Sequence, residues 1–226
     1  MSAFSHKPKW ARYFLSVDSK ANIHPETHQE PNRSYRPVEP VYVVTDVEVD
    51  GATPGENSML SFASVAVNAK GEEADSFQAV LNTLDGATPD PLTMAWFQSQ
   101  PEALAAATHS PEPPREVVAR FVHWVQGLPG DAIFVAHPLA MDGPWMDFYL
   151  RRFAGIRLLK GPWTGERLFY AGGLCLRSFA AGKLNWPLWE CSPENYPPEW
   201  LGHCSHTHKA IDDARAYARL LAFLMD

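Results

Sequence analysis

The sequence predicts an α/β domain whose central sheet is mixed, with an antiparallel meander followed by parallel strands and with helices on its flanks. The meander is indicated by apolar segments at residues 41–49, 59–68 and 75–81, which are separated by short turns rich in Gly, Pro and Asn. Residues 132–136 are apolar without polar alternation. That pattern is typical of a strand buried on both faces, as in a parallel sheet.

Helical periodicity follows the meander. We expect helices at 92–97, 102–108 and 116–125, the last with the 3, 4, 7 spacing of an amphipathic helix. A fourth helix is expected at 142–153, opened by the sequence DGP, because proline is tolerated in a first turn. Residues 208–225 predict a closing helix with one apolar stripe.

The segment 161–201 is punctuated by Gly, Pro and Trp, and its pattern is weak. It predicts one strand near 174–176 and a short helix near 178–182. The Pro-rich and His-rich residues 1–40 show no period, and we interpret them as a partly irregular extension of a single domain at 41–226.

Composition narrows the class of protein. The chain has no apolar run near eighteen residues and no apolar signal-like segment at its start, so we expect a soluble, cytoplasmic protein without a membrane partner. Its three cysteines, Cys175, Cys191 and Cys204, are an odd number without close pairing. This favours a reducing compartment over a disulfide framework.

Charge is unevenly distributed along the chain. The formal net charge of −7 by itself argues against a polyanionic partner. However, Lys70 is the only base among the many acids of residues 46–102, whereas Glu166 is the only acid among the bases of 151–183. One part could hold cations and the other could meet anions, or both could be solvated faces.

The first strand ends in acidic residues. Asp46 and Glu48 follow the apolar run 41–44, and alternate residues of a strand share a face, roughly 7 Å apart. Two carboxylates held that close at the rim of a core raise each other's pKa unless a cation lies between them. Oxygen ligands of this kind suit Mg²⁺ or Mn²⁺.

Three further candidates lie far away in the sequence. Asp142 follows the buried strand, and His208 and Asp213 stand at the start of the last helix. Each has a simpler interpretation by itself, because Asp142 could cap its helix and the other two could be exposed polar residues.

Taken in order, however, the segments 46–51 (DVEVDG), 134–142 (FVAHPLAMD) and 208–214 (HKAIDDA) resemble the three motifs of the DEDDh group of 3′–5′ exonucleases. That group belongs to the ribonuclease H-like superfamily, so the resemblance implies a ribonuclease H-like fold. It spans about residues 42–221. Pro138 departs from the group's pattern, since many members carry Asn there.

The resemblance implies hydrolysis of phosphodiester bonds at the 3′ end of single-stranded RNA or DNA, with release of nucleoside 5′-monophosphates. Two divalent ions, Mg²⁺ or Mn²⁺, would be held by the four carboxylates, and His208 would accept the proton of the attacking water. These residues are Asp46, Glu48, Asp142, Asp213 and His208. Relatives in the group are often dimers, so a homodimer is also an expectation.

Helix geometry constrains the third motif. If His208 and Asp213 both lay within the helix, five steps of about 100° would leave them on different faces. We therefore expect His208 to precede the helix. Asp212 fits the spacing from His208 better, but the resemblance favours Asp213.

Two other functions remain open from the sequence. The residues Cys191, His203, Cys204, His206 and His208 could form a structural zinc site of a binding protein. A catalytically silent nucleic-acid-binding domain of the same fold is the other alternative. Trp96 and Phe97 could be platforms for nucleobases, but burial habits favour the core for both.

Overall fold

The computed structural model describes residues 39–159, 161, 166–204 and 206–226. The extension expected at residues 1–40 lies outside them, apart from its last two residues. The described strands form one sheet, in the spatial order β3-β2-β1-β4-β5.

The sheet is mixed, as the sequence predicts. Its strands are β1 (Val41–Val49), β2 (Met59–Val67), β3 (Glu73–Val80), β4 (Ala132–Ala136) and β5 (Leu174–Cys175). β1, β2 and β3 pair antiparallel, whereas β4 runs parallel to β1 and β5 runs parallel to β4. The meander and the parallel half are therefore both confirmed.

Six α-helices and one 3-10 turn accompany the sheet in the described part of the chain. They are α1 (Pro91–Gln98), α2 (Pro101–Thr108), α3 (Pro114–Gln126), α4 (Leu139–Ala154), α5 (Leu176–Leu184), η2 (Pro198–Leu201) and α6 (Ala210–Met225). None of the helices in this part is long and apolar enough to cross a bilayer.

The start of α4 differs from the expectation. The helix begins at Leu139 rather than at Asp142, so Asp142 lies in its first turn and does not cap it, and Pro144 lies inside the helix. Pro138 occupies the capping position with extended backbone angles. Because proline cannot donate a helical hydrogen bond, a helix readily starts directly after it.

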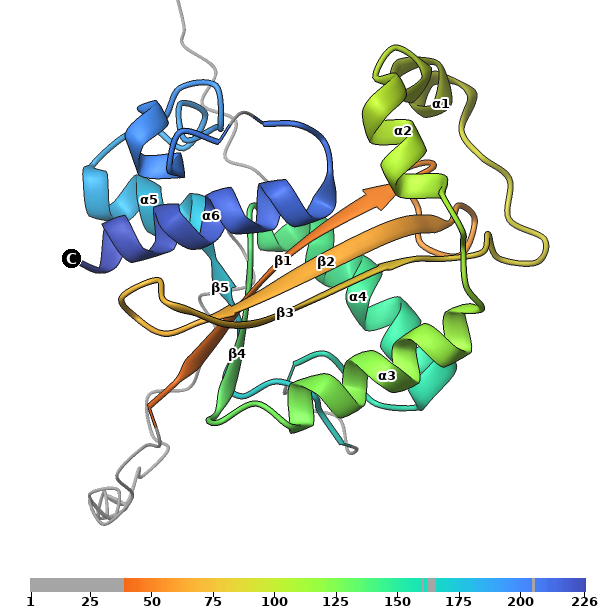
Figure 1. The fold of residues 1–226 in the computed structure, drawn as a ribbon, viewed down its shortest axis with the longest axis horizontal. Helices are drawn as coiled ribbons and strands as arrows, with labels where there is room; N and C mark the ends of the chain where they lie inside the picture. The colour runs from red at the N-terminus through yellow and green to blue at the C-terminus, as the bar shows by residue number, and fades with distance from the viewer. Residues whose placement is uncertain (1–38, 160, 162–165, 205) are drawn as a thin grey trace, which may run out of the picture. The chain divides into compact units, whose positions relative to one another are not determined.

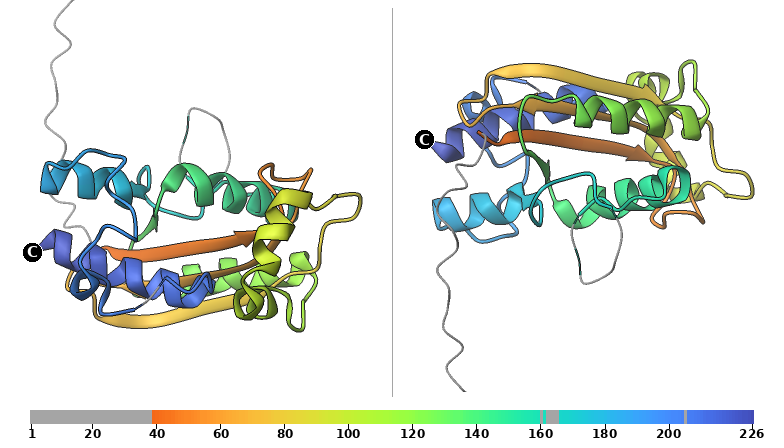
Figure 2. Two further views of the ribbon diagram at one scale, coloured as in Figure 1. Left: turned by 90° about the horizontal axis from the view of Figure 1, so that it is seen from above. Right: turned by 90° about the horizontal axis from the view of Figure 1, so that it is seen from below.

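The sheet is covered on both faces. Val43 and Val47 of β1 pack into the core cluster that contains α3 and α4, whereas Val44 packs into the cluster that contains α5 and α6. This alternation follows from the two-residue period of a strand. Figure 2 shows α4 and α6 on opposite sides of β1.

One edge of β1 is open near its end. β2 pairs with β1 along almost its whole length, but β4 pairs only with Val41–Val44. Residues from Thr45 onward therefore extend beyond β4. The pair α1 and α2 lies near this end of β1 in Figure 1, and Phe97 packs with Leu60 of β2 and the small residues of α2. The overhang places Asp46 and Glu48 among α1, α4 and α6.

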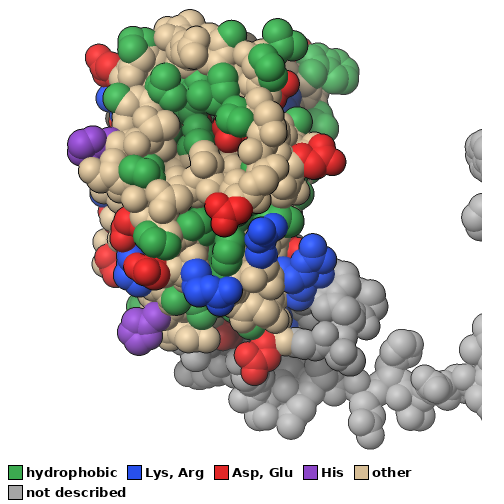
Figure 3. Space-filling model, turned by 90° about the vertical axis from the view of Figure 1, so that its right-hand side faces the viewer, with side chains coloured by type: hydrophobic (Ala, Val, Ile, Leu, Met, Phe, Trp, Pro, Cys, Tyr) green, Lys and Arg blue, Asp and Glu red, His purple; other side chains and the backbone are tan. Residues whose placement is uncertain are grey.

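Charged side chains are mixed on the surface that Figure 3 shows. Lys and Arg side chains gather in the lower half of that face with acidic side chains among them, while hydrophobic side chains gather in the upper half, at the level of α1 and α2. Leu92 and Trp96 of α1 are 82% and 46% exposed. The face in view therefore combines a basic area and an apolar area.

A buried hydrogen bond joins α4 to the meander, and its removal should destabilise the fold. The hydroxyl of Tyr149 accepts from the backbone N–H of Met59 at 2.8 Å in the core. Tyr149→Phe leaves that buried N–H without a partner, so we expect the free energy of unfolding to fall by about 1–3 kcal/mol. Urea denaturation measures it. Tyr170→Phe, at an exposed tyrosine, is the control, and an equal effect of both changes would contradict the assignment.

Candidate active site

The five residues singled out in the sequence line one cavity. Its volume is about 380 Å³, and it lies where β1 overhangs β4. Asp46 and Glu48 come from β1, and both keep part of their surface exposed to it. Asp142, His208 and Asp213 line the same space. The sheet and the two helices thus bring together residues separated by up to 167 positions in the chain.

Asp142 is held by the open edge of β1. Its Oδ1 accepts a hydrogen bond from the backbone N–H of Val47 at 3.2 Å, and the side chain is only 3% exposed. That N–H is free for Asp142 because β4 does not reach so far along β1. The first turn of α4 is therefore tied directly to the strand that carries Asp46 and Glu48.

Asp213 reaches the cavity from the first turn of α6. It is 1% exposed, and its Oδ1 accepts from the backbone N–H of Thr207 at 3.2 Å. Its Oδ2 is buried and has no hydrogen-bond partner. Carboxylate oxygens of Asp46, Glu48 and Asp213 lie within 4.8 Å of one another. The neighbouring Asp212 instead accepts from the hydroxyl of Thr207 at 3.1 Å and does not line the cavity.

Burial raises the pKa of three of the carboxylates, and neighbouring charges add to the effect at two of them. Burial, followed by the charges of Asp142, Glu48 and Asp213, holds the pKa of Asp46 well above its usual range. Burial and the charges of Asp213 and Asp142 raise the pKa of Glu48 to about 8. Burial also raises the pKa of Asp142 to about 7, against the opposing hydrogen bond from Val47.

His208 lies two residues before α6, as helix geometry required. Its φ of 54° is in the left-handed region, which is costly for a residue with a side chain and is often found at functional sites. Its imidazole lies nearly perpendicular to the ring of Trp96, with ring centroids 4.9 Å apart. Burial and the neighbouring His206 lower the pKa of His208, so the neutral ring prevails at neutral pH.

The prediction that Trp96 belongs to the core is wrong, whereas the same prediction for Phe97 is confirmed. Phe97 is 1% exposed, but Trp96 is 46% exposed and lines the cavity. Adjacent residues of a helix point about 100° apart, so only one of the two can face α2 and β2. The sequence could not show which one.

The sequence analysis missed several side chains of the cavity. Arg177 and Glu194 line it from the segment whose pattern was weakest, and Tyr217 lines it from α6. His206 Nδ1 lies 3.1 Å from Asp213 Oδ1, close enough for its N–H to donate a hydrogen bond to that carboxylate. A signal for His206 was present, because it precedes His208 by two residues, but it was assigned to the cysteine-containing cluster.

That cluster does not assemble. In the described part of the chain, the groups of three or more residues able to hold a metal ion include no cysteine. Cys191 is fully buried, and its thiol faces the carbonyl of Pro187 at 3.6 Å. The zinc site considered from the sequence therefore lacks the cysteines it needed.

The second motif's histidine supports the wall of the cavity. His137 stacks on Tyr217 with ring centroids 4.7 Å apart, and its Nε2 lies 3.0 Å from the hydroxyl of Tyr196. Burial lowers the pKa of His137 to about 4, so this ring stays neutral. It positions α6 beside β4 without adding charge to the acidic cavity.

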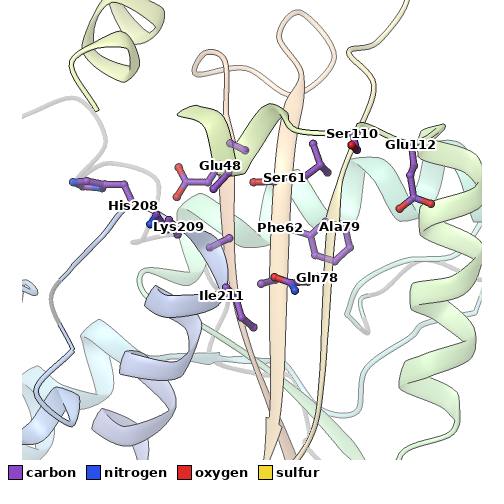
Figure 4. A pocket seen from close by; sticks show the side chains of 15 residues that line it. Glu48, Ser61, Phe62, Gln78, Ala79, Ser110, Glu112, His208, Lys209 and Ile211 are labelled. Carbon is purple, nitrogen blue, oxygen red and sulfur yellow. The ribbon is translucent and has the colours of Figure 1, made fainter. Parts of the chain in front are cut away.

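A second hollow adjoins the first. It has a volume of about 220 Å³ and shares Glu48 and His208 with the cavity. Figure 4 shows Glu48 reaching from β1 toward the segment of His208 and Lys209, while Ser61 and Gln78 line the hollow from β2 and β3. Glu48 and His208 therefore stand between the cavity and the adjoining hollow.

The residues fit divalent metal ions. The donors are hard carboxylate oxygens, one of them buried without a partner, and their mutual repulsion is relieved only by protons or cations. Acidic groups with this composition favour Mg²⁺ or Mn²⁺ over metals that prefer sulfur.

Comparisons with known proteins agree on the fold. No family model and no curated protein matches the chain. Among solved structures, the nuclease domain of 3′hExo, described as a DEDDh family member bound to rAMP, is similar at 12% identity and a TM-score of 0.58, over 83% of this chain and 92% of that one. A 3′-exonuclease that recognises the 3′ end of a histone mRNA stem-loop matches at 11% identity and a TM-score of 0.53, over 83% and 81%.

Exonuclease I is a third similar structure, at 15% identity and a TM-score of 0.58. The match covers 80% of this chain but only 39% of exonuclease I, so the chain spans well under half of that protein. At such identities the likeness establishes the fold. The chain therefore has the ribonuclease H-like fold found in DEDDh 3′ exonucleases, as the motifs predicted.

The raised pKa values predict that stability depends on pH when metal is absent. Because Glu48 titrates at about 8 in the folded protein instead of 4.5, the folded state holds its proton more tightly than the unfolded state does. The free energy of unfolding should therefore be highest below about pH 4.5 for this group, and should fall as the pH rises toward 8, by on the order of a few kcal/mol.

Urea denaturation in chelator at a series of pH values measures this slope. Glu48→Gln should flatten it, and Mg²⁺ should restore stability at pH 8. Glu116→Gln, at an exposed glutamate of α3, serves as the control. A slope that is the same in wild type and Glu48→Gln would refute the coupling.

Proposed function

We propose that the chain is a metal-dependent 3′–5′ exonuclease. It hydrolyses the terminal phosphodiester bond at the 3′ end of single-stranded RNA or DNA and releases a nucleoside 5′-monophosphate. Residues 41–226 form the exonuclease domain, and residues 1–40 form an extension to it. A homodimer stays a prediction.

One observation supports this proposal above all others. Four carboxylates and an imidazole from β1, α4 and the start of α6 line one cavity, although burial and repulsion raise the pKa of several of these groups. Such an arrangement is unfavourable without cations, and perturbed groups gathered in a cleft are typical of functional sites. The fold shared with 3′ exonucleases supports the same reaction.

The roles follow from position and chemistry. Asp46, Glu48, Asp142 and Asp213 would hold two divalent ions, Mg²⁺ or Mn²⁺. Bound there, these ions would lower the pKa of the attacking water and neutralise charge on the attacking and leaving oxygens. His208 accepts the proton of that water, since its lowered pKa keeps the ring neutral and able to accept. Attack on phosphorus then breaks the bond to the 3′ oxygen of the preceding nucleotide.

The dimensions of the cavity favour a strand end. A volume of about 380 Å³ is at the small end of the range of ligand pockets, which suits one nucleotide better than a duplex. Trp96, which is 46% exposed and lies beside His208, offers an aromatic ring for contact with a terminal base. Arg177 contributes a permanent positive charge to the same cavity and can meet a phosphate group.

A time course on matched RNA and DNA strands labelled at the 5′ end tests the reaction. With Mg²⁺ or Mn²⁺ we expect a ladder that shortens by one nucleotide at a time. Asp46→Asn and Asp213→Asn should lower the rate by at least about 100-fold because they remove metal-binding charge. His208→Ala should cost about 100- to 10,000-fold, as expected for a lost general base.

Asp212→Asn is the matched control, because Asp212 adjoins Asp213 but does not line the cavity, and it should keep near-normal activity. Circular dichroism checks that each variant is folded. Binding of the strands without any product would favour the silent nucleic-acid-binding alternative instead. Internal cleavage products would show that the nuclease is not an exonuclease.

Trp96→Ala should weaken the binding of strand ends. Base stacking on an aromatic ring contributes about 1–3 kcal/mol, so we expect KM to rise by roughly 5- to 150-fold with a smaller change in kcat. Initial rates over a range of strand concentrations measure both. Leu92→Ala removes a more exposed apolar residue of α1 that lies outside the cavity. A similar rise in KM for both variants would mean that α1 acts only through general apolar contact.

A further inference from the structure

Two histidines, His206 and His208, lie close to the buried carboxylate of Asp213 at the start of α6. His206 Nδ1 lies 3.1 Å from Asp213 Oδ1, and the rings of His206 and His208 are 4.1 Å apart between centroids at an angle of 71°. One donor atom from each of the three side chains lies within 4.8 Å of the other two. This group is distinct from the three-carboxylate group of Asp46, Glu48 and Asp213, but it shares Asp213 with it.

The shared carboxylate has a free oxygen. Asp213 Oδ1 is occupied by His206 and by the N–H of Thr207, whereas Oδ2 is buried without a partner. Asp213 can therefore serve either group. Glu194 lines the same cavity and interacts electrostatically with both imidazoles, which is the kind of carboxylate that commonly orients histidine ligands.

The two groups differ in the metals they favour. Three carboxylates suit Mg²⁺ or Mn²⁺, whereas two imidazoles and one carboxylate suit Zn²⁺ and neighbouring transition ions. A tetrahedral zinc site with bonds of about 2.0–2.1 Å requires ligand atoms roughly 3.4 Å apart. The Nδ1–Oδ1 distance of 3.1 Å already matches this spacing. The His208 donor lies within 4.8 Å of the other two, so it has to approach them for tetrahedral coordination.

We propose that His206, His208 and Asp213 form a second metal site, selective for Zn²⁺ or a similar transition ion, which competes with the carboxylate site for Asp213. The site is partly open, because the His206 side chain is 28% exposed, so a free ion can enter from solvent. Its occupation removes Asp213 from the carboxylate group and makes the His208 ring a ligand. The inhibitory consequence rests on the proposed nuclease function, but the binding itself does not.

Binding is tested on the full chain in excess Mg²⁺, so that hard carboxylate sites are filled. Zn²⁺ is titrated against a coloured chelator, and Co²⁺ is used as a probe whose visible absorption reports low coordination number and nitrogen ligands. We expect one Zn²⁺ ion to bind, with an apparent affinity that falls as the Mg²⁺ concentration is raised. His206→Gln should weaken Zn²⁺ binding by more than about 100-fold, because changes outside the ligand shell typically cost about 10- to 100-fold.

His203→Gln is the matched control, since His203 belongs to the same segment, is exposed and lies outside the group. It should leave Zn²⁺ affinity unchanged. A second variant, Glu48→Gln, weakens only the carboxylate group, so it should keep or raise the apparent Zn²⁺ affinity in excess Mg²⁺. The inference is overturned if His206→Gln binds Zn²⁺ like wild type, or if Glu48→Gln loses Zn²⁺ while His206→Gln keeps it.

Activity provides the second measurement. Zn²⁺ should inhibit Mg²⁺-dependent shortening of strands. The inhibition constant for Zn²⁺ is measured relative to each variant's own uninhibited rate. In His206→Gln it should rise by the same factor as the dissociation constant for Zn²⁺. Equal inhibition of wild type and His206→Gln would contradict the competition. If neither the wild type nor any variant shortens strands, the proposed nuclease function fails. The Zn²⁺ titration still tests whether His206, His208 and Asp213 form a metal site. If strands are shortened but His206→Gln binds Zn²⁺ normally, only this inference fails.

Discussion

The arrangement of side chains around the cavity depends on one unfavourable interaction. This is the repulsion between carboxylates at the end of β1 that extends beyond β4. Asp46, Glu48, Asp142 and Asp213 line one cavity, and burial, together with the charges of Asp142 and Asp213, raises the pKa of Asp46 and of Glu48. Packing on both faces of the sheet opposes that repulsion, because apolar contacts fix α4 on one face and α6 on the other. The core therefore holds together a cluster of carboxylates that bound cations would stabilise.

The short pairing of β4 is what makes room for the site. Since β4 stops at the level of Val44, the next free N–H on that side of β1 binds Asp142 instead of another strand. A longer β4 would occupy this edge and push α4 away. A local feature of sheet register thus determines where a residue nearly a hundred positions away in the chain can act.

The loop before α6 gives Asp213 two kinds of neighbour. On one side are the carboxylates of β1, and on the other are His206 and His208. The left-handed backbone of His208 turns its ring toward Trp96 and the cavity. Because hard oxygen donors and imidazoles prefer different ions, the metal content of the surroundings can influence which set Asp213 joins.

Local patterns in the sequence determined the meander, the buried strand, the placement of Asp46 and Glu48 on one face, and the position of His208 before α6. These features depend on periodicity over a few residues. Only the tertiary structure decided that Trp96 faces the cavity while Phe97 is buried, that α4 begins at Leu139, and that His206 contacts Asp213 rather than a cysteine. These outcomes depend on which distant surfaces meet, and side-chain contacts between distant segments leave no local periodic signal.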